Sequence, residues 1–395
     1  MGISGAPKLK PDNDVIIVGC GPAGATLAYE LASKGIKVLV LEKARLPRYK
    51  CCAGGLTMKA ARLLGEDLRG LVDDVISGAT ITLSGKNPYY GYSSEPIMYT
   101  VTREKFDLAL VKRAEKAGAD ILQDTEVRSV VFNGQGVDVS TAEGNLRCKI
   151  VAGADGARGI VARAMGAGAN RRHITGIETE VMVDRNELAR WRSRVAIDIG
   201  RIRGGYGWVF PKANHLSIGM GCLADKAKNL KRFFLEFLQS LKLGRYSIAR
   251  WTAGIVPVCT GPRTLACGRA ILLGDAAALA DPLTGEGLHN AILSAQLAAP
   301  AIQKSLNGDE QALEEYSRCL EEKIMCDMRV AYTFSKMLAQ LPGKLFGLLN
   351  RDERVWNTCC RMLCGETNYS GIKNRISSLG GLYHLVMRSE PNARI

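Results

Sequence analysis

The chain has 395 residues, of which 47% are hydrophobic, and a formal net charge of +14. This length allows either one large α/β core with an inserted sheet or several domains. The basic excess favours anionic partners: phosphates, an acidic electron-carrier protein or an anionic membrane surface. No nucleic-acid partner is expected, because aromatic residues are only 6% of the chain and no nucleic-acid-binding module is evident.

Targeting signals and metal-binding patterns are not evident. Residues 1–13 hold Gly, Pro and Lys without an apolar segment, which predicts a flexible arm. Without a spanning apolar run, a cytoplasmic protein is expected, or one held on the inner face of the membrane. None of the 12 cysteines forms a C-x-x-C pair, so no metal site is expected. Cys359, Cys360 and Cys364 are interpreted as helix-packing thiols, with cluster ligation as the alternative.

The first motif predicts a nucleotide-binding βαβ unit. Residues 15–18 are an apolar β-branched run, residues 25–33 have helical character, and residues 38–41 are a second apolar run ending at Glu42. Gly35 is expected to cap the helix. Glu42 is placed to accept hydrogen bonds from a ribose diol.

A G-x-G-x-x-G turn joins the first strand to the helix. Gly19 permits the tight turn, Gly21 lets a pyrophosphate approach, and Gly24 lets helix and strand pack closely. The phosphate meets the positive end of the helix dipole, beside Ala23. The alternative is a glycine-rich turn of some other α/β protein.

The rest of the chain predicts alternating helices and strands. The first half predicts a glycine loop at 47–56, a helix to 64, a strand at 79–83, a turn-rich stretch at 86–94, a helix at 102–117, a strand pair at 120–139 around Asn133-Gly134, and a strand at 148–152. The second half predicts sheet at 175–183, 195–199, 204–212 and 215–221, a helix at 230–241, a strand at 270–273, a helix to 302, and helices from 314 onward with breaks at Pro342 and Gly365.

Three separated signatures point to one superfamily. They are the opening motif with Glu42, the Gly-Ala-Asp-Gly-Ala-Arg turn at 153–158, and Gly274-Asp275 with a glycine-rich helix start at 285–287. Together they resemble the flavoprotein monooxygenases and reductases of the para-hydroxybenzoate hydroxylase fold.

Two further motifs resemble the geranylgeranyl reductase family. The loop 50–56 is similar to that family's K-x-C-G-G-G-L loop, with Ala53 where glycine is usual. Residues 206–212 with Gly219 match its Y-x-W-x-F-P-K…G signature. The tail sequence Gly-Glu-Thr-Asn-Tyr at 365–369 is also similar. The resemblance covers nearly the whole chain after Asn13.

The resemblance implies an α/β (α+β) fold with FAD as cofactor. A Rossmann-like FAD-binding domain is expected from 14–76, 101–174 and 265–312, an inserted mixed β-sheet substrate domain from 77–100 and 175–264, and a helical C-terminal region from 313–395. The implied cofactor-binding residues are Gly19, Gly21, Ala23, Gly24, Glu42, Cys52, Ala53, Gly55, Arg103, Val127, Asp155, Asp275, Gly287 and Leu288.

Several of these residues have simpler alternatives. Arg103 is expected to reach FAD phosphate or ribitol oxygens, but it could be a surface charge at a helix start. Asp275 is expected to bond the ribitol, but it could only cap a helix. Cys51 and Cys52 are adjacent, and register with the paired glycines selects Cys52 as the family cysteine. Cys52 is the candidate catalytic residue, for proton relay or gating; a packing role is the alternative.

The resemblance implies an enzyme that hydrogenates C=C bonds of geranylgeranyl lipid chains. Hydride would come from reduced FAD and a proton from the protein, with NAD(P)H or reduced ferredoxin as electron donor. Tyr206, Trp208 and Phe210 alternate on one strand face and are the candidate prenyl-binding residues; plain core is the alternative. A monooxygenase or halogenase of the same fold, or a non-catalytic flavin-binding lipid carrier, remain rival functions.

A lipid substrate implies contact with a bilayer. Residues 331–349 carry apolar residues with Lys336 and Lys344 among them, and arginines follow. This pattern suits a helix lying in the interface of an anionic leaflet. A helical cap packed on the flavin domain is the alternative.

Overall fold

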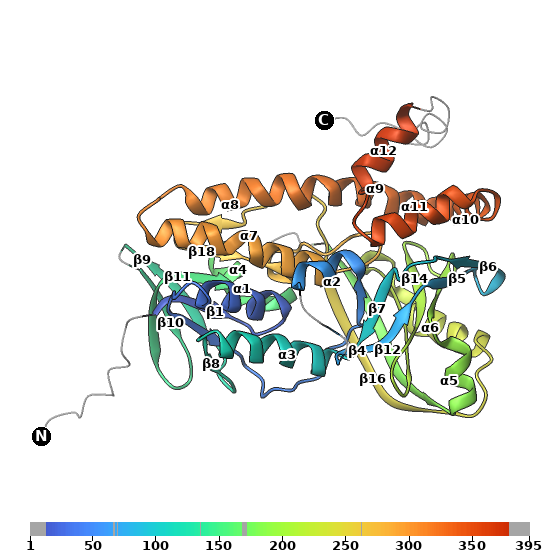
Figure 1. Ribbon diagram of the computed structural model, residues 1–395, viewed down its shortest axis with the longest axis horizontal. Helices are drawn as coiled ribbons and strands as arrows, with labels where there is room; N and C mark the ends of the chain where they lie inside the picture. Colours follow the sequence, from blue (N-terminus) through green and yellow to red (C-terminus); the bar gives the residue numbers. More distant parts are fainter. Residues whose placement is uncertain are drawn as a thin grey trace, which may run out of the picture.

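The computed structural model describes residues 13–65, 68, 70–134, 136–167, 172–261 and 263–378. The described strands form three sheets, which have eight, seven and three strands. Helices cover the eight-stranded sheet, and a further group of helices follows near the C-terminus (Figure 1). Most of the expected N-terminal arm, and the end of the expected helical tail, lie outside the described residues.

The eight-stranded sheet is built around β1. β1 pairs in parallel with β2 on one side and with β11 on the other. Residues 15–17 of β1 are fully buried, as expected for a central parallel strand covered on both faces. The strands are β1 (Asn13–Val18), β2 (Val38–Leu41), β8 (Asp120–Leu122), β9 (Ser129–Asn133), β10 (Gly136–Ser140), β11 (Asn145–Gly153), β17 (Ala266–Cys267) and β18 (Ala270–Leu272).

Helices pack on this sheet and on one another. α1 begins at Pro22, earlier than expected, because proline suits the first turn, where its missing N–H costs nothing. α1 packs against α3 and α7, and α7 packs against α8. The helices are α1 (Pro22–Ala32), α2 (Met58–Leu64), α3 (Arg103–Lys116), α4 (Ile160–Ala164), α7 (Leu288–Leu306) and α8 (Ala312–Leu320).

The seven-stranded sheet has the order β16-β12-β15-β14-β13-β5-β6. One face packs on α6, where Phe234 and Phe237 are buried and the Phe237 ring lies over Gly207. The strands are β5 (Gly78–Leu83), β6 (Lys86–Tyr92), β12 (His173–Val183), β13 (Arg194–Ile199), β14 (Gly205–Pro211), β15 (Leu216–Leu223) and β16 (Tyr246–Pro257), with helices α5 (Arg185–Trp191) and α6 (Leu230–Ser240). The small sheet holds β3 (Gly55–Thr57), β7 (Met98–Val101) and β4 (Val72–Ile76).

The expectation of a turn-rich stretch at 86–94 is wrong, because residues 86–92 form strand β6. Pro88 is tolerated there because β6 lies at the end of the sheet and pairs only with β5. Gly91 also has a packing reason, since a Cβ there would lie 2.5 Å from the Trp356 ring. The indole N–H of Trp356 donates to the Tyr92 carbonyl at 2.7 Å.

The C-terminal helices break where the sequence indicates. α9 (Cys326–Gln340) is followed by α10 (Pro342–Arg351), which begins at the expected proline. α11 (Glu353–Leu363) ends just before Gly365, whose φ is +76°, and α12 (Tyr369–Ser378) follows. None of the helices in the described part of the chain combines the length and apolarity needed to cross a bilayer.

Candidate functional site

The glycine turn between β1 and α1 has the clearances that a bound pyrophosphate needs. A Cβ at Gly24 would lie 2.0 Å from the Gly19 carbonyl oxygen, so helix and strand touch there. Gly19 has a φ of +96°, and a Cβ there would lie 2.5 Å from the Ala154 carbonyl oxygen. At Gly21, by contrast, a Cβ would approach only the tip of Arg48, at 3.6 Å. The turn is therefore closed at its first and third glycines and open at its second.

Glu42 is buried at the end of β2, beside this turn. Its carboxylate accepts the backbone N–H of Cys20 at 2.7 Å and that of Ala44 at 3.1 Å. Arg48, which the sequence interpretation did not select, forms ion pairs with Glu42 at 3.5 Å and with Asp107 at 3.3 Å. In the sequence, the only feature that could have indicated a role for Arg48 is its position as a basic residue in the loop that leads to the paired glycines. Its guanidinium is well placed to meet an anion at Gly21.

Arg103 lies at the start of α3 and is buried rather than on the surface. Its guanidinium forms a two-point ion pair with Asp107, at 2.8 and 2.9 Å. It also interacts with Cys52. Burial acts to lower the pKa of Arg103, but the charge of Asp107 holds that pKa above its usual range. Arg103 and Arg48 thus share Asp107 and link the glycine turn to the Cys52 loop.

Asp275 lies beside the first turn of α7. A Cβ at Gly287, which precedes Leu288 at the helix start, would be 3.4 Å from the Asp275 carboxylate. Burial raises the pKa of Asp275, with the charges of Lys50 and Arg103 opposing it. Within the described residues its carboxylate forms no hydrogen bond, so it is available to a ligand hydroxyl.

Asp155 and Val127 occupy different surroundings. The Asp155 carboxylate accepts the backbone N–H groups of Ile160 and Val161, at 2.6 and 3.1 Å, and so caps the start of α4. Val127 is buried in the segment after β8, where Thr125 donates its backbone N–H to the Glu42 carbonyl at 2.9 Å. The Asp155 carboxylate has a structural role, and Val127 lies in the segment that is bonded to Glu42.

The loop with the paired glycines packs against the seven-stranded sheet. A Cβ at Gly55 would lie 2.8 Å from the Phe210 ring. The Lys212 ammonium is buried and donates to the carbonyls of Ala53 and Val101, at 2.6 and 2.7 Å. Phe210 therefore holds the loop in place.

The two adjacent thiols point to different partners. Cys52 accepts the backbone N–H of Gly54 at 3.3 Å and lies near Arg103. Cys51 donates to the buried carboxyl of Glu178 on β12, at 3.5 Å. Burial raises the pKa of the Cys51 thiol to about 12. The thiol of Cys51 is therefore held protonated, against the inner face of the sheet.

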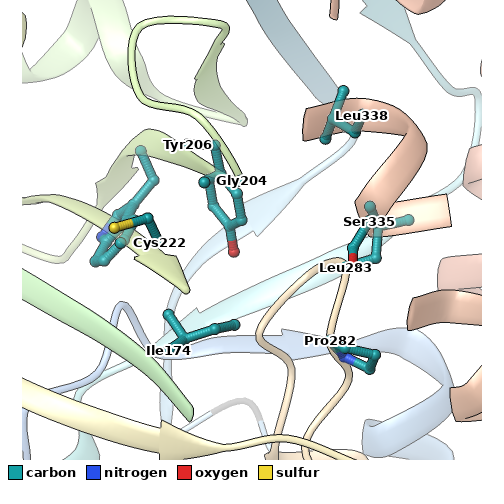
Figure 2. Close-up of a pocket in the computed structure, with 11 residues that line it drawn as sticks. Ile174, Gly204, Tyr206, Cys222, Pro282, Leu283, Ser335 and Leu338 are labelled. Carbon is teal, nitrogen blue, oxygen red and sulfur yellow. The ribbon is translucent and has the colours of Figure 1, made fainter. Parts of the chain in front are cut away.

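Tyr206 and Trp208 line a small apolar cavity between the sheet, the loop at 282–283 and α9. Figure 2 shows the Tyr206 ring between Cys222 on one side and Leu283 with α9 on the other. The Tyr206 hydroxyl donates to the Thr284 carbonyl. The indole N–H of Trp208 is buried and has no hydrogen-bond partner among the residues that the structure describes. Phe210, on the same strand face, does not line this cavity.

A second, small cavity with a mostly polar lining lies farther along the same sheet face. It is bounded by Cys52 and Arg103 on the loop side, and by Glu178, Lys212 and His215 on the sheet side. Sequence reasoning did not select Glu178, because an acid in a strand of mixed polarity carries no local signal of burial.

The tail motif at 365–369 packs onto the loop that lines the first cavity. The Tyr369 hydroxyl donates to the buried carboxylate of Asp281 at 2.6 Å. Burial raises the pKa of Asp281. In the same loop Glu286 pairs with Lys59 at 2.8 Å and accepts a hydrogen bond from Thr57. The loop before α7 is therefore held from both the C-terminal helices and α2.

These residues fit FAD. The open space over Gly21, the partnerless carboxylate of Asp275 at a helix start and the buried Glu42 match a pyrophosphate, a ribitol and a ribose. In the described part of the chain, no group of three or more His, Cys, Asp or Glu side chains has a metal-binding arrangement.

Comparison with known proteins agrees with this geometry. A family model described as FAD binding domain matches residues 12–204. An uncharacterized protein of Methanosarcina barkeri is 31% identical over 93% of this chain and 95% of its own length. Digeranylgeranylglycerophospholipid reductase 1 of Methanopyrus kandleri is 32% identical over 84% of this chain and 92% of its own length. The chain belongs to the geranylgeranyl reductase family of FAD-dependent oxidoreductases.

A solved structure shares the fold of this geranylgeranyl reductase family member. It is described as a geranylgeranyl bacteriochlorophyll reductase-like protein from Thermoplasma acidophilum. The two structures align with a TM-score of 0.78 over 95% of this chain and 97% of the other, at 23% sequence identity. The expected α/β flavoprotein fold is confirmed. The family expected from the motifs at 50–56 and 206–212 is confirmed as well.

Proposed function

We propose that this protein hydrogenates C=C bonds in the geranylgeranyl chains of lipids. The observation that carries the proposal is the apolar cavity lined by Tyr206 and Trp208, which lies on the same sheet face as the loop of Cys52. An apolar cavity next to a flavin loop suits a hydrocarbon chain better than a polar metabolite. The name of the Methanopyrus relative, a lipid reductase, supports the same substrate class.

When bound in reduced form, FAD supplies the hydride. The protein's own residues then have four tasks. Gly21 and Arg48 receive the pyrophosphate, and Glu42 and Asp275 receive the sugar hydroxyls. Tyr206 and Trp208 hold the alkene in one orientation, which matters because an isolated alkene is a poor electrophile. The closely packed loop at 50–56 excludes water from the reacting carbons.

Cys52 is the proposed proton-relay or gating residue, with a packing role as its rival. Its thiol lies near Arg103 and lines the polar cavity, which is consistent with either role. The rate at saturating lipid in a Cys52→Ser variant separates them. An unchanged rate removes the relay role.

NAD(P)H or reduced ferredoxin is the proposed electron donor, and an anionic leaflet the proposed site of action. In the stretch 331–349, Phe346 and Leu349 are buried, and Leu349 belongs to a cluster with Trp356. The other apolar residues of the expected face are half-buried. Exposed cations such as Lys344 and Arg351 on α10, with the basic excess of the chain, support the proposed membrane contact.

Mass spectrometry of lipids from cells with and without the gene tests the function directly. The proposal expects prenyl chains to gain two hydrogens per reduced bond only when the protein is present. Oxygen-dependent NADPH consumption stimulated by an aromatic compound would instead indicate a hydroxylase. Bound FAD that turns over with no prenyl lipid would indicate a carrier.

A further inference from the structure

Glu178 is a buried carboxyl group in the middle of the substrate sheet. Only 3% of its surface is exposed. One carboxyl oxygen accepts from the Cys51 thiol at 3.5 Å and the other from the Ser217 hydroxyl at 3.1 Å. A buried acid costs free energy unless it is neutral or paired. No ion pair within 4 Å compensates Glu178 among the described residues, so a function is expected to retain it.

The sheet register places Glu178 beside the aromatic cavity. Glu178 on β12 lies directly opposite Gly219 on β15, and Gly219 lies directly opposite Trp208 on β14. Directly opposed residues project to the same face. Since Gly219 has no side chain, the Trp208 indole extends over it, and no side chain of β15 stands between the indole and the carboxyl group.

Glu178 also borders the polar cavity that Cys52 and Arg103 line from the flavin-loop side. Glu178 therefore lies close both to Trp208, which is proposed to bind the prenyl chain, and to the loop of Cys52. We propose that Glu178 is a catalytic residue, the acid that supplies the proton for alkene reduction, held in place by Cys51 and Ser217. This assignment rests on the proposed function.

The step balances in atoms and charge. One alkene carbon receives the hydride from reduced FAD. The O–H bond of Glu178 breaks and a C–H bond forms at the other carbon, leaving a carboxylate. Lys212, whose charge favours the ionised acid, stabilises this carboxylate. Water entering the polar cavity then returns the proton.

The burial of Glu178 favours its protonated form before the step. Burial raises its pKa, and Lys212, Ser217 and Cys51 oppose the shift. The titratable and polar groups facing it from the packed elements are Tyr49 and Cys51 of the loop, Glu180 of β12, Lys212 just after β14, Ser217 of β15 and Thr252 of β16. Only a protonated acid can donate, so turnover must fall as pH rises through this pKa.

A Glu178→Gln variant tests the assignment, assayed on a digeranylgeranyl glycerophospholipid in detergent micelles with dithionite as reductant. Turnover should fall about 100-fold or more. FAD content and the rate of FAD reduction should match those of the unmodified protein. Glu178→Asp, which keeps a carboxylic acid, should recover part of the turnover and the high-pH limb. Glu187→Gln is the control, because Glu187 is another buried acid, held by Trp191 on α5 away from both cavities.

A Glu178→Gln variant with turnover within threefold of the unmodified protein would overturn the assignment. If that variant fails to fold, infrared spectroscopy of the unmodified protein decides. The assignment is supported by a carboxylic-acid C=O band that is present at pH 7, shifts in Glu178→Asp and disappears at the pH where turnover is lost. The absence of such a band overturns the assignment. An unmodified protein that binds FAD but reduces no prenyl lipid refutes the proposed function as well.

Discussion

The indole of Trp208 occupies the space that a side chain would fill at Gly219, with an indole carbon 2.2 Å from the Cβ position. The two residues lie directly opposite each other on β14 and β15. The glycine of the family signature is therefore the counterpart of its tryptophan, and it lets the Trp208 indole take its place in the wall of the apolar cavity.

Gly219→Ala should displace the Trp208 indole. Overpacking of this kind costs about 1–3 kcal/mol of unfolding free energy. We expect a lower denaturant midpoint together with slower lipid turnover. Gly244→Ala is the matched control, because a Cβ there meets nothing within 4 Å. Equal effects of both substitutions would show that the clearance at Gly219 has no special role.

Trp208→Ala should slow turnover of long prenyl lipids while FAD content stays unchanged. Loss of one well-packed aromatic contact is expected to weaken lipid use by about tenfold, equivalent to about 1.4 kcal/mol. Trp251→Ala serves as control, since Trp251 is 41% exposed on the edge strand β16. If Trp208→Ala also loses its flavin, the aromatic strand is ordinary core.

Glu42→Arg should weaken FAD binding. The substitution places a cation where the ribose diol needs an acceptor and where Arg48 already lies. Absorbance of the purified protein and the rise in melting temperature on FAD addition measure the effect. Glu42→Gln keeps an oxygen that accepts from Cys20 and should retain most of the FAD. An unmodified protein that is colourless and unaffected by FAD would contradict the cofactor assignment.

His215 should make folding stability depend on pH. Burial, and then the charge of Lys212, lowers the pKa of His215 to about 4. The unfolded chain, with a histidine pKa of about 6.5, binds a proton first as pH falls. Stability is therefore full above about pH 6.5 and is lost as pH falls toward 4, by less than about 1.4 kcal/mol per pH unit because His215 is partly exposed. Melting temperatures of His215→Gln should fall less over that range; parallel curves would exclude His215 as the cause.

Binding to vesicles should require anionic lipid and should weaken with salt. The exposed cations on α10 act through screened electrostatic attraction. Flotation with anionic and neutral liposomes, at low and high salt, measures this. A Lys344→Glu, Arg351→Glu variant should float less than the unmodified protein. Protein that stays unbound in every condition would require a separate lipid carrier.

The opening motif could be predicted to within three residues at its strand and helix ends, because local rules determine it. The strand at 15–18, the tight turn and the strand at 38–41 each depend on residues a few positions apart. The fold class followed from the three separated flavoprotein signatures. Helix ends at Pro342 and before Gly365 were likewise predictable from backbone chemistry.

Features that depend on distant partners could not be predicted. The sequence of strand β6 resembles a turn because it contains Gly91. This glycine makes room for Trp356, which is far away in the chain, so its reason cannot be seen locally. The role of Arg48 depends on Asp107, and the burial of Glu178 depends on contacts from β15, from β16 and from the loop of Cys51. Which thiol touches the sheet was also undetermined, since only the fold shows that Cys51 meets Glu178.

The neighbours of β1 have a consequence for how the chain is made. β1 and β2 leave the ribosome early, but β11 pairs with β1 only after residues 145–153 exist, and β18 completes that side only at residues 270–272. A nascent chain therefore carries an exposed edge of apolar strand for most of its synthesis, which invites pairing with other chains. Expression at low temperature or with chaperones should raise the soluble yield, and truncation before residue 270 should give aggregated protein.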